Sequence, residues 1–163
     1  MEESMETYRY CPLCAGELQE KTIDGAQRRV CTSPSCTFIY WNNPLPVVAA
    51  LIEHDGKVLL ARNTAWPEKV FGLVTGFLEA GESPDEGIIR EVKEELNLEA
   101  KIEGLIGLYN HEKANQLIIA YHVTAEGTVS MSDEIAETRH VPREKLRPWP
   151  FGTGLAVRDW LEK

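Results

Sequence analysis

The stretch GFLEAGESPDEGIIREVKEELNL, from Gly76 to Leu98, decides the fold that we expect for this chain. Ser83 and Glu86 have the spacing of a capping box, in which each side chain bonds the other residue's backbone N–H where a helix begins. Pro84, which has no N–H to satisfy, fits the first helical position. Asn97 tolerates left-handed backbone and is expected to end the helix. Apolar residues recur between them at helical spacing and indicate a face that packs on a core: Ile88, Ile89, Val92 and Leu96.

Three glutamates share another face of this expected helix, because Glu91, Glu94 and Glu95 stand at i, i+3 and i+4. On an isolated helix, such like charges repel one another. Mg²⁺ or Mn²⁺, which prefer oxygen ligands, would remove that repulsion. The rival interpretation is a solvated helix face, the usual meaning of an acidic run. The helix alone leaves both interpretations open.

The residues around the helix resemble the Nudix box, a pattern of Gly, Glu, Arg-Glu and Glu-Glu with aliphatic residues at fixed spacing. The matching positions are Gly76, Glu82, Arg90, Glu91, Val92, Glu94, Glu95 and Leu98. Asn97 stands where the family usually has Gly, and Val74-Thr75 stand where it usually has Pro-Gly. The resemblance covers about residues 44–163 and implies an α/β fold, namely an α/β/α sandwich with a mixed sheet.

The resemblance also implies a site for catalytic Mg²⁺ (or Mn²⁺). Glu91 and Glu95 would be metal ligands, and Glu94 would be a further ligand or a relay. The carbonyl region of Thr75 and Gly76 would add a neutral oxygen ligand. Bound metal ions would neutralise a pyrophosphate and activate water for an in-line attack at phosphorus.

Two further roles follow from the same resemblance. Arg90 would orient the carboxylates, with Glu82 as its ion-pair partner. A carboxylate outside the box is expected from EIAETRHV, Glu134 to Val141, where the match falls on Glu137. Three helix carboxylates rarely satisfy several Mg²⁺ ions that each take about six oxygens. The alternative for Glu137 is a surface ion pair with Arg139 or a neighbour.

The expected reaction is Mg²⁺-dependent hydrolysis of a pyrophosphate bond in a nucleoside diphosphate linked to another group, such as NADH, ADP-ribose or FAD. With four cysteines ahead of the box, the layout resembles the NADH pyrophosphatase branch of the family. In that branch an SQPWPF tract follows the box, but here the equivalent stretch is HEKANQ, His111 to Gln116. The PWPF at 148–151 is interpreted as packing on the last helix. We therefore expect no strong preference for NADH.

One aromatic side chain is expected to stack on the nucleobase, and the candidates are Trp66, Phe71, Tyr109 and Trp149. A different class of function, a nucleotide sensor or scaffold without turnover, would be favoured by a damaged box. Here the acids and the Arg of the box are all present.

The sequence on either side of the box predicts strands. Asp55-Gly56 between two apolar runs indicates a hairpin. A last helix is expected to start at a Thr153 cap. The segments expected to be strands are Val47–Glu53, Lys57–Arg62, Phe71–Val74, Ala100–Tyr109, Leu117–Thr124 and Glu134–Val141. Strands around two helices indicate a mixed α/β domain.

The four cysteines all precede the turn-forming NNPLP at 42–46. Cys11-x-x-Cys14 and Cys31-x4-Cys36 have the spacing of a structural Zn²⁺ site. The rival reading is two disulfides, which needs an oxidising compartment. We predict a zinc ribbon over 1–43 and a Nudix hydrolase domain over 44–163.

The net charge of −9 argues against a nucleic-acid partner, since phosphate contacts come from Lys and Arg. Residues 1–43 contain six acids and four bases, which favours a structural or homodimer-forming role for the ribbon. The first ten residues, MEESMETYRY, have neither a basic start nor an apolar stretch, and the longest apolar run is too short to cross a membrane. We therefore expect a cytoplasmic protein that acts on a nucleotide-type small molecule.

Overall fold

The computed structural model describes residues 8–163, which divide into two compact units between Asn43 and Pro44. Residues 1–7 are outside the described part. They include most of the ten-residue segment in which the sequence shows no secretory signal. Among the described residues, no helix is both long and apolar enough to span a bilayer.

The N-terminal unit is a three-stranded antiparallel sheet in the order β1-β2-β3. Its strands are β1 (Leu18–Ile23), β2 (Ala26–Cys31) and β3 (Ile39–Tyr40). Asp24 and Gly25 both have positive φ, as the tight turn between β1 and β2 requires. The buried residues are few, namely Cys11, Leu18 and Cys31. So small a core needs another source of stability, such as a bound metal.

The C-terminal unit is built on a six-stranded mixed sheet in the order β7-β8-β4-β5-β9, with β6 paired to β4. The β4–β8 pair is parallel and the other pairs are antiparallel. The strands are β4 (Leu45–His54), β5 (Lys57–Asn63), β6 (Val74–Phe77), β7 (Glu99–His111), β8 (Gln116–Glu126) and β9 (Ile135–Val141). The helices are α1 (Pro84–Leu96) and α2 (Gly154–Leu161), with 3-10 turns η1 (Glu112–Ala114) and η2 (Arg143–Lys145).

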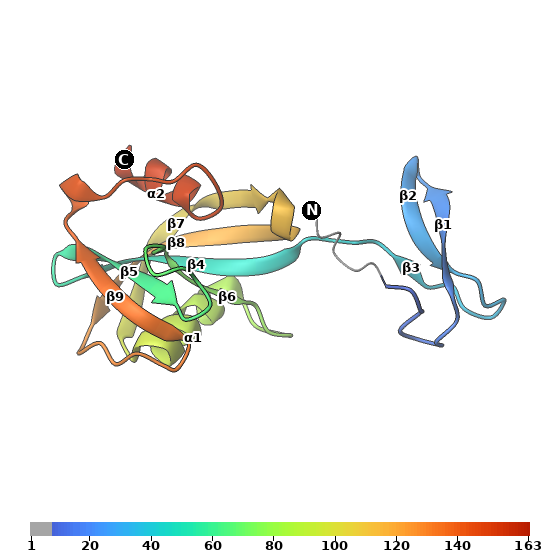
Figure 1. Cartoon of the computed structure of the whole chain (residues 1–163), viewed down its shortest axis with the longest axis horizontal. Helices are drawn as coiled ribbons and strands as arrows, with labels where there is room; N and C mark the ends of the chain where they lie inside the picture. The colour runs from blue at the N-terminus through green and yellow to red at the C-terminus, as the bar shows by residue number, and fades with distance from the viewer. Residues whose placement is uncertain (1–7) are drawn as a thin grey trace. The chain divides into compact units, whose positions relative to one another are not determined.

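Helices α1 and α2 cover opposite faces of this sheet (Figure 1). Strand β4 shows why, because successive side chains of a strand point to opposite faces. Val48, Ala50 and Ile52 pack in one core with the apolar side of α1, whereas Ala49 and Leu51 pack in the other with α2. Buried on both faces, β4 reads as a continuous apolar run. The predicted α/β/α sandwich with a mixed sheet is confirmed.

Helix α1 begins and ends as its sequence predicts. Ser83 accepts from the backbone of Glu86, the return bond of the capping box is present, and Asn97 is left-handed at φ 56°. Two other predictions were imprecise. Strand β6 starts at Val74 rather than Phe71, and Gly72 makes only an isolated bridge to Ala61. Thr153 precedes α2 but makes no side-chain capping bond.

Candidate active site

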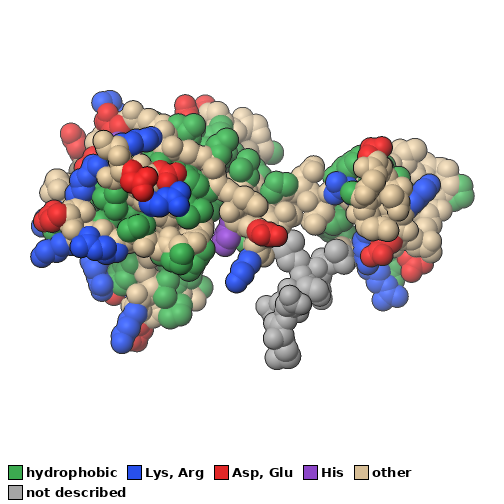
Figure 2. All heavy atoms as spheres, turned by 90° about the horizontal axis from the view of Figure 1, so that it is seen from above, with side chains coloured by type: hydrophobic (Ala, Val, Ile, Leu, Met, Phe, Trp, Pro, Cys, Tyr) green, Lys and Arg blue, Asp and Glu red, His purple; other side chains and the backbone are tan. Residues whose placement is uncertain are grey.

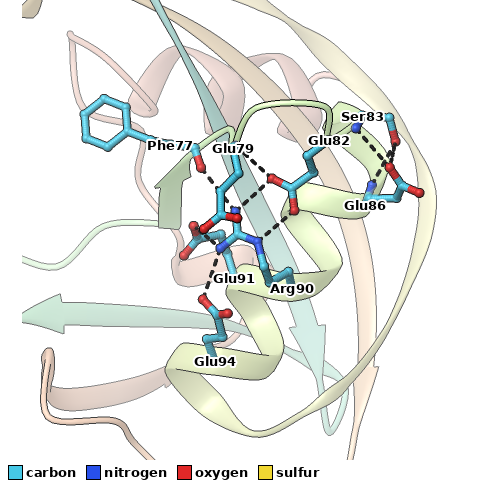
Figure 3. Close-up of polar contacts among 8 residues, drawn as sticks. All are labelled: Phe77, Glu79, Glu82, Ser83, Glu86, Arg90, Glu91 and Glu94. Atoms are coloured by element: carbon cyan, nitrogen blue, oxygen red, sulfur yellow. Dashed lines mark hydrogen bonds and ion pairs between the residues drawn. The ribbon is translucent and has the colours of Figure 1, made fainter.

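Arg90 is the centre of a network that joins α1 to the loop before it (Figure 3). Its guanidinium donates to both oxygens of Glu82, at 2.7 and 2.9 Å, and to the carbonyl of Phe77 at 3.2 Å. One further nitrogen, Nη1, donates to Glu91 at 2.8 Å and to Glu94 at 3.0 Å. The predicted Arg90–Glu82 ion pair is therefore present. Because one rigid group contacts all these partners, the loop and two carboxylates have fixed relative positions.

Glu82 is the structural member of this network. The hydrogen bonds from Arg90 and from the backbone N–H of Glu79 lower the pKa of Glu82 to about 2. Its carboxylate therefore stays charged through the neutral range and keeps the loop attached to α1.

Glu95 lies one turn after Glu91 on the acidic face of α1, and its surroundings disfavour its charged form, in contrast to those of Glu82. It is 8% exposed, and none of the described side chains donates a hydrogen bond to it. Burial, together with the charges of Glu91, Glu134 and Glu94, raises the pKa of Glu95 to about 7. Burial also raises the pKa of Glu91, which Arg90 opposes. Ionisation of these clustered carboxylates is unfavourable without a partner of opposite charge. A bound divalent cation would supply that positive charge.

These glutamates open onto an acidic pocket of about 280 Å³, lined by Glu91, Glu94, Glu95, Ser132, Asp133 and Glu134. The loop before β9 reaches it because its amides bond the last carbonyls of α1. Ser130 N–H donates to Leu96 and Ser132 N–H donates to Glu95, each at 2.9 Å. This pairing satisfies the helix end and brings Glu134 to the carboxylates. Sequence reasoning missed Glu134, whose only signal was an acidic pair, Asp133-Glu134, just before a strand.

Glu137 is placed differently. Its carboxylate lies 3.7 Å from Arg62, opposite it on β5, and 3.3 Å from Arg139. It does not line the acidic pocket. A metal-binding role for Glu137 therefore stays a prediction, to be weighed against Glu134.

Gly76 lets β6 approach α1 closely. A Cβ at this position would lie 1.9 Å from the carboxyl group of Glu91. Any side chain there would clash with that carboxylate and displace it, so only glycine fits at position 76. The backbone of Thr75 and Gly76, paired with β4, therefore lies beside the acidic face of α1.

A second and larger pocket, of about 720 Å³, has mainly apolar and aromatic walls. A narrow cavity beside Glu95 shares Trp66, Leu73 and Thr75 with it, so the acidic and aromatic regions adjoin. The side chains that give the large pocket its character are Trp66, Phe71, His111, Trp149 and Phe151.

Three of the four predicted stacking candidates line this aromatic pocket: Trp66, Phe71 and Trp149. Tyr109 is buried and donates to Asp159 at 2.8 Å, away from the pocket lining. Trp149 also packs on the start of α2, where a Cβ on Gly154 would lie 2.5 Å from its ring. The PWPF tract thus packs on the last helix and lines the pocket as well. His111, Ala114 and Gln116 of HEKANQ line the same pocket.

In the N-terminal unit, the sulfur atoms of Cys11, Cys14, Cys31 and Cys36 all lie within 4.8 Å of one another. The four cysteines are free thiols, with Sγ atoms 3.4 Å apart for Cys14–Cys31 and 3.7 Å apart for Cys11–Cys36. Four convergent thiols fit a tetrahedral Zn²⁺. The arrangement is compatible with the predicted zinc ribbon.

A model of the NUDIX domain matches residues 43–159. The chain belongs to the Nudix family. It is 36% identical over 120 residues to the NAD-capped RNA hydrolase NudC of Mycobacterium tuberculosis, covering 71% of this chain and 36% of that protein. It is 29% identical over 151 residues to NudC of Pseudomonas aeruginosa, covering 91% of this chain and 52% of that protein. This Nudix chain thus spans between about a third and a half of these relatives.

The crystal structure of a NUDIX hydrolase from Nitrosomonas europaea is similar to this Nudix protein, with a TM-score of 0.75 and 26% identity. The similarity covers 85% of this chain and 80% of that one. The likeness therefore extends over most of both chains.

Proposed function

We propose that this Nudix protein is a Mg²⁺-dependent (or Mn²⁺-dependent) pyrophosphohydrolase that cleaves a nucleoside diphosphate linked to another group. The observation that carries the proposal is the junction of two pockets. Buried Glu95 lines the acidic pocket and also a small cavity that shares Trp66, Leu73 and Thr75 with the aromatic pocket. Such a junction suits a substrate that is anionic at one end and planar at the other.

We assign Glu91 and Glu95 as metal ligands and Glu94 as a further ligand or a relay. Thr75 and Gly76 offer backbone oxygen nearby, and Glu134 from the loop adds a carboxylate. When bound, Mg²⁺ supplies charge neutralisation of the phosphates and lowers the pKa of a coordinated water. The disfavoured ionisation of Glu95 and Glu91 supports this assignment.

The chain's own groups do the positioning. Arg90 holds Glu91 and Glu94 in place through Nη1, while its pairing with Glu82 keeps the loop closed on α1. Holding the carboxylates before substrate arrives stabilises the charge that develops in the transition state. Arg90 and Glu82 thus act through the carboxylates that they orient.

For the substrate, we propose that the aromatic pocket receives a base and that a linked diphosphate, as in NADH, ADP-ribose or FAD, reaches the acidic pocket. Aromatic walls stack on any planar base. The name of the mycobacterial relative, NAD-capped RNA hydrolase, brings capped RNA into consideration. The face in Figure 2 spreads Lys and Arg among acidic and apolar side chains, and the net charge is −9. This supports small nucleotides over long RNA contacts.

We further propose that residues 1–43 form a structural zinc ribbon and that residues 44–163 form the hydrolase domain. The convergence of the four thiols supports the ribbon. With its cysteines saturated, such a zinc would be non-catalytic. A homodimer-forming role for the ribbon and a cytoplasmic location remain predictions.

A substrate panel tests the function. Product release from NADH, ADP-ribose, FAD, diadenosine polyphosphates, nucleoside triphosphates and NAD-capped RNA should be measured with and without Mg²⁺. We expect Mg²⁺-dependent cleavage of the diphosphate link in at least one of the first three compounds. Binding of these nucleotides without turnover would instead indicate a sensor or scaffold.

A further inference from the structure

A second group of metal-ligating side chains lies at the turn between β4 and β5. His54 ends β4, Asp55 stands in the turn and His140 lies on β9. One ligand atom from each lies within 4.8 Å of the others. His140 is six residues from Glu134, about 20 Å along an extended strand. The group is therefore separate from the acidic pocket.

His54 is held in one tautomer. It is 4% exposed, and its Nε2 lies 2.9 Å from the carbonyl oxygen of Gly127. A carbonyl only accepts, so Nε2 carries the proton and Nδ1 carries a lone pair. Histidines that ligate metals in proteins are oriented in this way, with the second ring nitrogen donating to a backbone carbonyl or carboxylate.

That lone pair faces the other two groups. His54 Nδ1 accepts a hydrogen bond from His140 Nε2 at 2.8 Å, which an ion bound between them would replace, and lies 3.6 Å from the Oδ2 of Asp55. Around a tetrahedral ion with bonds of about 2.0–2.1 Å, ligand atoms lie about 3.3 Å apart. Moving the half-buried His140 ring outward by about 0.5 Å therefore makes room for an ion. Asp55 is 83% exposed and leaves one side open to solvent.

We propose that His54, Asp55 and His140 form a site for a borderline divalent transition metal of the Zn²⁺ type. Two imidazole nitrogens and one carboxylate suit Zn²⁺, Co²⁺ or Ni²⁺, whereas Mg²⁺ prefers oxygen ligands alone. The site has three protein ligands and an open position.

The surroundings keep the imidazole of His140 neutral, as ligation requires. Burial lowers the pKa of His140, and the charge of Lys57 lowers it further, whereas Asp55 opposes them. Asp55 has a left-handed φ of 52° in the tight turn, which fixes the direction of its side chain. A bound ion ties the β4–β5 hairpin to β9, and so stabilises this edge of the sheet.

The test counts zinc on the full chain in excess Mg²⁺, by competition with a chromogenic chelator, for wild type and His140→Gln. The wild type is expected to bind one more Zn²⁺ than the variant in the competition. The affinity of the His54–Asp55–His140 site for zinc should be at least about a hundredfold higher in the wild type than in His140→Gln. The difference does not depend on how much zinc the four cysteines hold. Zinc should also raise the melting temperature of the wild type more than that of His140→Gln.

His122→Gln is the matched control, because His122 pairs with Glu53 at 2.6 Å and belongs to no ligand cluster among the described residues. It should bind zinc like the wild type. If His140→Gln does not fold, Asp55→Asn replaces it, since Asn tolerates the left-handed turn, with about tenfold weaker binding expected. Equal zinc uptake and equal thermal shifts for the wild type and the ligand variant would overturn the proposal.

Discussion

Glu95→Gln should stabilise the metal-free protein at neutral pH while it destroys the proposed catalytic site. Glutamine keeps the shape of the side chain and removes a charge that is buried among Glu91, Glu94 and Glu134. A residue selected for a metal site is expected to show this opposition between stability and function.

The magnitude follows from the pKa. Burial and neighbouring charges raise the pKa of Glu95 from 4.5 to about 7, so the folded state holds its proton more tightly than the unfolded state. Stability is therefore greatest below the unfolded value and falls as the pH rises from about 4.5 to about 7. Each pKa unit corresponds to about 1.4 kcal/mol, so the fall due to Glu95 is on the order of 3 kcal/mol.

The assay is urea unfolding at pH 5 and pH 8 without Mg²⁺, followed by tryptophan fluorescence. Three of the four tryptophans, Trp66, Trp149 and Trp160, lie in the C-terminal unit and report on it. The wild type should lose about 3 kcal/mol of unfolding free energy between the two pH values through Glu95, and Glu95→Gln should lack this loss. Added Mg²⁺ at pH 8 should stabilise the wild type more than the variant.

Glu99→Gln is the control, because Glu99 is 80% exposed and pairs only with Lys93 among the described residues. It should follow the wild-type pH dependence. Parallel curves for Glu95→Gln and the wild type would refute the reasoning, since they would mean that Glu95 titrates normally in the fold.

Three further outcomes are expected. Glu134→Gln should lower kcat by about tenfold or more and raise the Mg²⁺ requirement. Glu137→Gln should have a smaller effect, because the carboxylate of Glu137 contacts Arg62 and Arg139. A larger effect of Glu137→Gln would identify Glu137 as the added metal ligand. Elemental analysis should find one tightly held zinc in the ribbon, and a mass that indicates two disulfides would contradict it. The kcat/KM for NADH should exceed that for ADP-ribose and FAD by less than about a hundredfold, or 2.7 kcal/mol, and a larger ratio would show true NADH selectivity.

The parts of the fold that the sequence predicts are those specified by neighbouring residues. The capping box at Ser83, the left-handed Asn97 and the turn at Asp55 each depend on a few adjacent side chains. The Arg90–Glu82 pair was also within reach, because the two residues are only eight positions apart in the sequence. Local chemistry and the box pattern together were enough to place the acidic face of α1.

The features that the sequence does not predict arise from contacts between distant segments. Glu134 reaches the acidic pocket because Ser130 and Ser132 bond the end of α1, a pairing with no sequence pattern of its own. The aromatic pocket unites Trp66 with Trp149, which are 83 positions apart. Strand β6 starts later than the sequence predicts because it pairs with β4 along Val74 to Phe77. Each depends on tertiary packing.

The central claim is that metal-assisted hydrolysis of a diphosphate link depends on the buried carboxylates of α1. Its most direct test compares kcat of the wild type and Glu95→Gln in saturating Mg²⁺ on the best substrate of the panel. We expect a decrease of at least about a hundredfold, equivalent to about 2.7 kcal/mol of transition-state stabilisation, with the fold intact by circular dichroism. A folded Glu95→Gln variant with wild-type kcat would contradict it.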